Sequence, residues 1–202
     1  PKNWNKIWES SFKPVRISKD CVVRSEFHPT FNLKYEIIIT PKMSFGTGHH
    51  ETTLMVMNYI LDLNLVSLKV LDVGCGTGIL SILSEKRGAK AVDAVDTDRW
   101  CFENTRENSH LNSCKFIDIF FGDISLVKES KYDIILANIN KNIIMKQFSI
   151  YKDLLNTGGQ LIISGFFEYD IIEIDKKAKS LSFELVSQKV KKLWVSIHYI
   201  KI

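Results

Sequence analysis

One segment, Val70–Leu80, constrains the fold of this chain more than any other part of the sequence. It reads VLDVGCGTGIL, so a run of strand-forming apolar residues leads into three glycines at alternate positions, and a helical pattern follows. Glycine permits positive φ and close approach of the backbone to a ligand. The N–H groups at the start of the following helix are free to bind that ligand. The segment therefore predicts a strand, a ligand-binding turn and a helix.

The spacing of the glycines distinguishes between classes of cofactor. A dinucleotide-binding turn has the pattern G-x-G-x-x-G, and counting from Gly74 places the last glycine at Ile79. A P-loop needs a lysine directly after its last glycine, and no lysine follows any glycine here. The observed pattern, D-x-G-x-G-x-G, is typical of enzymes that bind S-adenosylmethionine (SAM). We therefore expect Gly74 and Gly76 to contact SAM.

Strand and helix patterns alternate after residue 45, which predicts a mostly parallel sheet covered by helices on both faces. We expect an α/β, Rossmann-like fold with a seven-stranded sheet and an antiparallel edge strand. Ligands bind such sheets at the carboxyl ends of the strands. The expected strands are 69–73, 91–95, 116–121, 132–137, 160–164, 183–190 and 193–200, the last two as a hairpin around Lys191 and Lys192. The expected helices are 51–63, 79–87, 98–109, 141–155 and 168–180.

The first 40 residues have a different pattern. Trp4, Trp8 and Phe12 fall at helical spacing, which predicts a short amphipathic helix, and short strands fit 21–23 and 35–40.

Composition excludes several classes of protein. Apolar residues make up 45% of the 202 residues and charged residues 25%, which are values of a folded globular chain. No apolar run is long enough for a transmembrane helix. The net charge of +4, with no run of Lys or Arg, gives no reason to expect direct nucleic-acid binding. The four cysteines form no C-x-x-C pair, which disfavours disulfides and zinc and favours a reducing, cytoplasmic location.

Polar residues stand where three of the predicted strands end. Asp96 follows Gly74 by 22 residues, and an acid at this position can accept hydrogen bonds from both ribose hydroxyls of a nucleoside. Asp123 follows the next strand; it can contact the adenine amino group or be a solvated turn residue. Asn138 ends the fourth strand and should face the same crevice.

A second motif, Ser44–Thr53, reads SFGTGHHETT and leads into the helix that begins near Glu51. Its polar groups at a helix N-terminus suit an anionic carboxylate. We expect Thr53 to meet the methionine end of SAM and the loop to close over the cofactor. His49 and His50 lack the H-E-x-x-H spacing of a zinc site, so we expect no metal.

Together these motifs resemble the PrmA family of ribosomal protein L11 methyltransferases. The motifs that carry the resemblance are Phe45–Thr53, Asp72–Gly78, Asp96–Asp98, Ala137–Ile139 and the Ser164-Gly165 step, within residues 41–170. The resemblance implies a SAM-dependent methyltransferase that modifies lysine side chains and the N-terminal amine of a large-subunit ribosomal protein.

The resemblance also implies which residues bind the cofactor and how the chain is divided. Thr53, Gly74, Asp96 and Asn138 would contact SAM. Residues 1–40 would be a linker-like helix with short strands and residues 41–202 the catalytic domain, and we expect the family's N-terminal substrate-recognition domain to be absent. No catalytic base is evident.

Two alternatives remain at this point. One is a SAM-dependent methyltransferase of another acceptor, such as RNA, DNA, glutamine or a small molecule. Enzymes that methylate planar amides or bases often carry Asn-Pro-Pro-Tyr after the fourth strand, whereas Ile139 and Asn140 follow Asn138 here. The other alternative is a SAM-binding module without catalysis.

Overall fold

The computed structural model describes residues 13–40, 46–127 and 131–202. The expected amphipathic helix around Trp4 and Trp8 lies outside these residues, as does Phe45 of the glycine-rich loop. Within the described part of the chain, no helix is long and apolar enough to cross a membrane.

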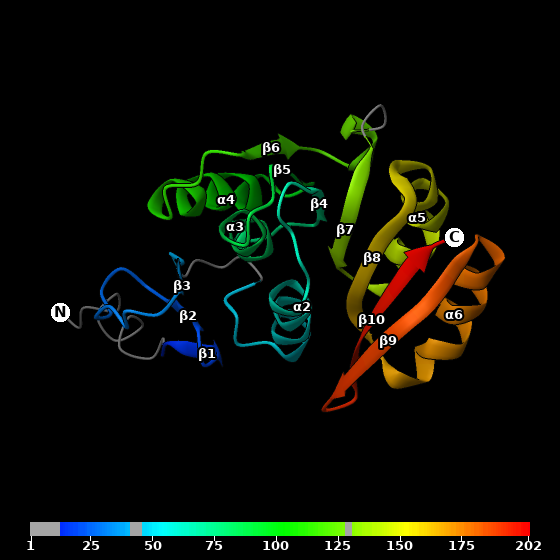
Figure 1. Cartoon of the computed structure of the whole chain (residues 1–202), viewed down its shortest axis with the longest axis horizontal. Coiled ribbons are helices and arrows are strands. Elements are labelled where there is room, and N and C mark those ends of the chain that lie inside the picture. The colour runs from blue at the N-terminus through cyan, green and yellow to red at the C-terminus, as the bar shows by residue number, and fades with distance from the viewer. Residues whose placement is uncertain (1–12, 41–45, 128–130) are drawn as a thin grey trace.

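A seven-stranded sheet forms the centre of the molecule, in the order β6-β5-β4-β7-β8-β10-β9 (Figure 1). Strands β4 to β8 pair in parallel, which confirms the expected α/β architecture. Its strands are β4 (Lys69–Val73), β5 (Ala91–Asp96), β6 (Ile117–Phe121), β7 (Tyr132–Asn138), β8 (Leu155–Phe167), β9 (Phe183–Lys191) and β10 (Trp194–Lys201). The α-helices are α2 (Glu51–Asp62), α3 (Ile79–Lys86), α4 (Arg99–Leu111), α5 (Lys141–Leu154) and α6 (Ile171–Ser180).

The expected hairpin of the last two strands lies at one edge of the sheet, with β9 antiparallel to its neighbour β10. β10 is antiparallel to both of its neighbours and lies between β8 and β9, so β9 forms the edge. The tight turn at Lys192 and Leu193, both with positive φ, returns the chain beside β9 and makes the β9–β10 pair antiparallel. The middle of β10 is buried, whereas β9 is largely exposed.

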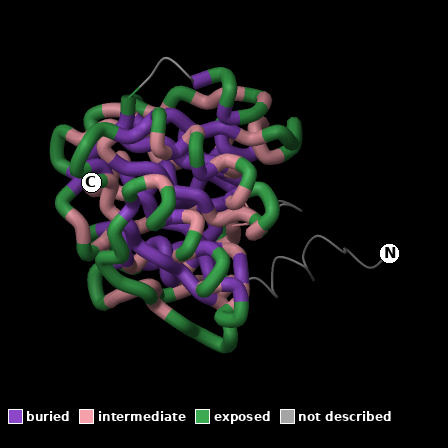
Figure 2. Tube along the Cα trace, turned by 90° about the vertical axis from the view of Figure 1, so that its right-hand side faces the viewer, coloured by how far each residue is buried: buried purple, intermediate pink, exposed green. Residues whose placement is uncertain are grey.

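Both faces of the sheet are covered, which explains the continuous apolar strands. Val70 belongs to a core that includes residues of α2 and α3, and its neighbour Leu71 belongs to a second core built with α5 and α6. Figure 2 shows these buried segments running through the centre of the molecule, with exposed segments around them.

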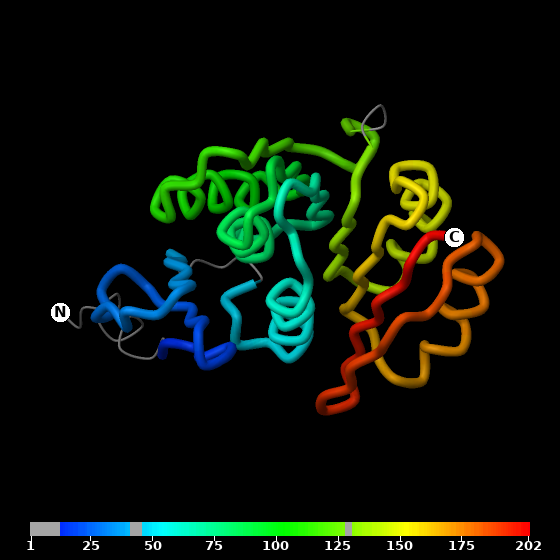
Figure 3. Tube along the Cα trace, in the orientation of Figure 1, coloured from blue at the N-terminus to red at the C-terminus, as the bar shows by residue number. Residues whose placement is uncertain are grey.

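A small sheet of β1 (Val15–Ser18), β2 (Cys21–Arg24) and β3 (Tyr35–Ile38) packs beside α2 and α3 (Figure 3). β2 and β3 match the expected short strands, whereas β1 was not anticipated. Val23 and Ile37 lie in the same hydrophobic core as α2 and α3. This sheet therefore packs as part of the same folded unit as α2 and α3.

Candidate functional site

The glycine turn connects β4 to α3 in a conformation that requires glycine. Gly74, Gly76 and Gly78 all have positive φ, between 60° and 78°. A Cβ atom on Gly74 would lie 2.3 Å from Cγ2 of Ile139, which is much closer than two carbon atoms can approach. The backbone of the turn can therefore pass beside the end of β7 only because this position has no side chain.

Two side chains of α4 donate hydrogen bonds to the glycine turn. The Thr105 hydroxyl donates to the carbonyl of Gly76 at 3.0 Å, and the Asn108 amide donates to the carbonyl of Thr77 at 2.8 Å. Asn108 also accepts a hydrogen bond from the backbone N–H of Thr40 at 2.8 Å. These hydrogen bonds hold the turn in place.

A cavity of about 420 Å³ lies at the carboxyl ends of β4, β5 and β7. This volume falls within the usual range of small-molecule sites. The cavity brings together five of the six residues that we expected to bind the cofactor: Gly74, Gly76, Asp96, Asp123 and Asn138. No group of three or more His, Cys, Asp or Glu that could hold a metal occurs among the residues that the structure describes.

Asp96 stands at the end of β5 and shapes the turn as well as the cavity. Its Oδ2 accepts from the N–H of Gly76 at 2.9 Å, and its Oδ1 accepts from the N–H of Asp98 at 2.9 Å. A carboxylate has about four lone-pair positions, so both oxygens can accept further hydrogen bonds from hydroxyls. Asp98 is the N-cap of α4 and accepts from the N–H of Trp100 at 2.7 Å.

Asp123 is a turn residue that also lines the cavity, and its expected contact with adenine stays a prediction. Its Oδ1 accepts from the N–H of Ser125 at 2.8 Å, as a turn residue does, and Asp123 also lines the cavity beside Gly122. The carboxylate is exposed.

Asn138 and Thr53 form a pair, and only Asn138 lines the cavity. Thr53 is fully buried, and its hydroxyl accepts a hydrogen bond from Nδ2 of Asn138 at 3.3 Å. The other amide atom, Oδ1 of Asn138, is buried and accepts no hydrogen bond from any described residue. In this structure Thr53 contacts Asn138 and does not itself line the cavity. Its expected contact with SAM stays a prediction. Sequence reasoning missed Thr52, which does line the cavity.

Asp72 lies beneath the turn. It is fully buried, and its Oδ2 accepts from both the N–H and the hydroxyl of Ser81 at 3.1 and 2.6 Å. Burial raises the pKa of the Asp72 carboxyl to about 7, because no water stabilises the charged form.

A row of aromatic rings, His50, Trp194, Phe167 and Tyr169, reaches the cavity through its first two members. The Trp194 ring lies edge-on to the His50 ring with centroids 4.8 Å apart, and 4.0 Å from the Phe167 ring. Tyr169 stacks on Phe167 at 5.4 Å. His50 and Trp194 line the cavity with Ile143. The sequence carried no signal for this row, because α2, β8 and β10 bring its members together from distant parts of the chain.

The matching family model and two relatives indicate the same family. The family model described as ribosomal protein L11 methyltransferase (PrmA) matches residues 1–201. The ribosomal protein L11 methyltransferase of Porphyromonas gingivalis is 46% identical over 200 residues, covering 98% of this chain and 69% of that protein. The protein of the same name from Phocaeicola vulgatus is 43% identical over 202 residues, covering 98% of this chain and 72% of its own length.

A solved structure shows the same architecture. The ribosomal protein L11 methylase from Lactobacillus delbrueckii subsp. bulgaricus superposes with a TM-score of 0.86 at 27% identity, covering 95% of this chain and all of that one. A methyltransferase from Pyrococcus furiosus, 19% identical with a TM-score of 0.68, covers 82% of this chain and 89% of its own and shares the fold. The chain belongs to the ribosomal protein L11 methyltransferase (PrmA) family.

Proposed function

We propose that this chain transfers methyl groups from SAM to amino groups of ribosomal protein L11 in the cytoplasm, both lysine side chains and the N-terminal amine. The observation that carries the proposal is the Oδ1 atom of Asn138, a buried acceptor that no described residue satisfies. Leaving such an atom without a donor costs free energy. We infer that a bound ligand donates the missing hydrogen bond.

The residues of the cavity fit SAM. The positive-φ turn at Gly74 and Gly76 lets the ligand lie against the backbone, and Asp96 has lone pairs for two ribose hydroxyls. Asp123 lines the same cavity and can accept from the adenine amino group. Bound SAM supplies a methyl group activated by its sulfonium. The protein's own task is then to hold the acceptor amine in line with that methyl group.

The aromatic row suits an aliphatic amine. A lysine amine has a pKa near 10.4 in water, so it must lose its proton before it can act as a nucleophile. The rings of His50 and Trp194, with the apolar Ile143, line the cavity; we propose that they limit the solvation of this amine and favour its neutral form. Asn138 Oδ1 can accept a hydrogen bond from this amine or from the ammonium group of SAM. We assign no catalytic base.

We also propose that residues 41–202 carry catalysis. The small sheet of residues 13–40 shares their hydrophobic core, so it belongs to the unit in which they fold.

The test is mass spectrometry of purified ribosomal protein L11 after incubation with this protein and SAM, with SAM binding measured separately by calorimetry. We expect mass increments in multiples of one methyl group on lysines and on the N-terminus. Asn138→Ala should lower kcat/KM by about tenfold or more, because it removes a hydrogen bond to a charged or reacting group worth roughly 1.5–3 kcal/mol.

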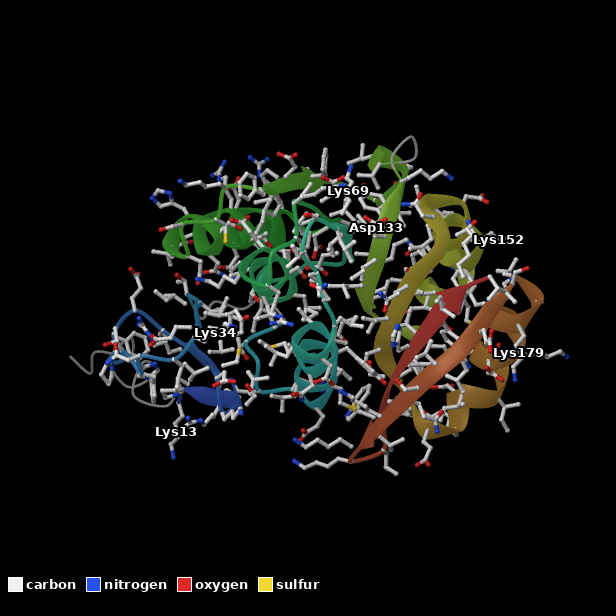
Figure 4. All side chains as sticks on the ribbon, viewed as in Figure 1. Lys13, Lys34, Lys69, Asp133, Lys152 and Lys179 are labelled. Atoms are coloured by element: carbon white, nitrogen blue, oxygen red, sulfur yellow. The ribbon has the colours of Figure 1, made fainter. Side chains whose placement is uncertain are left out.

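Asn156→Ala is a matched control. Asn156 donates its amide hydrogen bond to Asp133, which lies at the amino end of β7 with Lys69 at the start of β4 (Figure 4). This end of the sheet is opposite to the cavity. Methyl transfer to RNA or to a free amine in preference to L11 would contradict the proposed acceptor, and SAM binding with no transfer to any acceptor would indicate a non-catalytic module.

A further inference from the structure

Glu51 joins two distant parts of the chain through an ion pair with two lysines. It is the first residue of α2, and its carboxylate lies 3.0 Å from Nζ of Lys191 and 2.6 Å from Nζ of Lys192. The Glu51 side chain is only 14% exposed, whereas the two lysine side chains are 51% and 77% exposed. Hydrogen bonds from Lys192 and Lys191 hold the pKa of Glu51 below its usual value, so the carboxylate is charged at neutral pH.

Lys191 ends β9 and Lys192 begins the turn of the β9–β10 hairpin, which passes beside α2 (Figure 3). Lys192 and Leu193 have φ of 50° and 69°, the conformation of a two-residue turn in which Asn-Gly is the favoured sequence. Because neither residue is glycine, the turn itself costs free energy. Contacts outside the two turn residues offset this cost, among them the pairing of β9 with β10 and the ion pair with Glu51.

The ion pair lies directly beside the aromatic row. His50 precedes Glu51, Trp194 follows the turn by one residue, and their rings are in contact at 4.8 Å. Each ring thus lies within two residues of a member of the ion pair. The pair and the ring contact connect the same two elements, so displacement of the hairpin would move Trp194 along the wall of the cavity.

We propose that Glu51 is a positioning residue for acceptor binding: with Lys191 and Lys192 it holds Trp194 against His50 and so sets the shape of the acceptor end of the cavity. Glu51 is not among the residues that line the cavity, so it acts through the hairpin and not on the cofactor. The role in catalysis rests on the proposed methyltransferase function, whereas the position of Trp194 does not.

The chain offers a matched control on the same two elements. Asp62, at the other end of α2, pairs with Lys189 of β9 at 3.0 Å, and its side chain is 70% exposed. This second pair joins the same helix to the same hairpin, but it lies away from the aromatic row. If any ion pair between α2 and the hairpin had the same effect, Asp62→Asn would behave as Glu51→Gln does.

The experiment uses protein labelled with 5-fluorotryptophan and follows the ¹⁹F resonance of Trp194, assigned by its loss in Trp194→Phe. Trp100, which is 78% exposed on α4, provides an internal reference. We expect Glu51→Gln to shift or broaden the Trp194 resonance without moving that of Trp100. The KM for ribosomal protein L11 should rise by about fivefold or more, while the Kd for SAM stays within about twofold. Glu51→Asp should restore part of the lost affinity for L11. Asp62→Asn should change neither the Trp194 resonance nor the KM for L11.

The double variant Lys191→Met, Lys192→Met removes the same ion pair but keeps the acidic residue at the N-terminus of α2. If Glu51→Gln does not fold, the same measurements are made on this double variant. An unchanged Trp194 resonance in this double variant would overturn the proposal, as would equal losses in affinity for SAM and for L11. If the unmodified protein methylates no acceptor, the proposed function fails, and the ¹⁹F resonance still decides whether Glu51 positions Trp194.

Discussion

Asp72 makes the stability of this protein depend on pH, and Asp72→Asn should remove that dependence. The carboxyl is fully buried with a pKa of about 7, against 3.8 for an exposed aspartate. The difference of about 3 units corresponds to about 4 kcal/mol, at roughly 1.4 kcal/mol per unit. This free energy is the largest contribution that Asp72 can make to the change of stability with pH.

The sign follows from proton linkage. Below the unfolded pKa of 3.8, both states hold the proton, and above the folded pKa of about 7 neither state does. Between these limits only the folded state holds it, so the free energy of unfolding falls as the pH rises and reaches its lower plateau near the folded pKa. In the Asp72→Asn variant the amide does not ionise, and its oxygen can still accept the hydrogen bonds from Ser81.

Urea unfolding of both proteins, from about pH 5 to about pH 8, measures the effect. We expect the unmodified protein to lose stability relative to the variant across this range, by about 1 to 3 kcal/mol. His198 acts in the opposite direction, since burial lowers its pKa, but it is present in both proteins and cancels in the difference. Parallel curves for the two proteins would refute the burial argument for Asp72.

Three further changes test the cofactor end of the cavity. Asp96→Ala should weaken SAM binding by about tenfold or more in calorimetry, through loss of hydrogen bonds worth roughly 1.5–3 kcal/mol to a charged group; an unchanged Kd would exclude Asp96 from ribose binding. Gly74→Ala should lower the melting temperature and the SAM affinity far more than Gly158→Ala does. Both residues have positive φ, but a Cβ on Gly158 would meet no atom within 4 Å. Equal effects of the two substitutions would mean that backbone strain alone matters. Thr53→Val should leave Asn138 without its 3.3 Å partner and lower kcat/KM, while Thr53→Ser retains activity; if both variants match the unmodified enzyme, Thr53 does not orient Asn138.

Local patterns in the sequence determined most of the elements and the ligand-binding turn. The glycine spacing, the apolar strand before it and the acid at position 96 act over a few residues, and the structure brings Gly74, Gly76 and Asp96 to one cavity. Asp98 caps α4, and such an N-cap is a local feature, because it depends only on a side chain and the N–H groups two or three residues ahead.

Element boundaries were less well determined. β8 begins at Leu155, directly after α5, and is longer than the strand expected at 160–164, while α6 begins at Ile171 after a short 3₁₀ turn. Pairing with a neighbouring strand can lengthen a strand such as β8, and the propensities of its own residues do not predict that pairing.

The acceptor end of the cavity was decided only by the tertiary structure. Thr52 and Thr53 are adjacent in sequence, but a helix turns each residue by about 100° from the last, so one lines the cavity and the other is buried behind Asn138. His50 meets Trp194 because β10 inserts between β8 and β9 and the hairpin docks on α2. These contacts join residues far apart in the chain, and they depend on how whole elements pack together. No local periodicity encodes them, which is the physical reason that the sequence predicted the cofactor turn but not the ring row beside it.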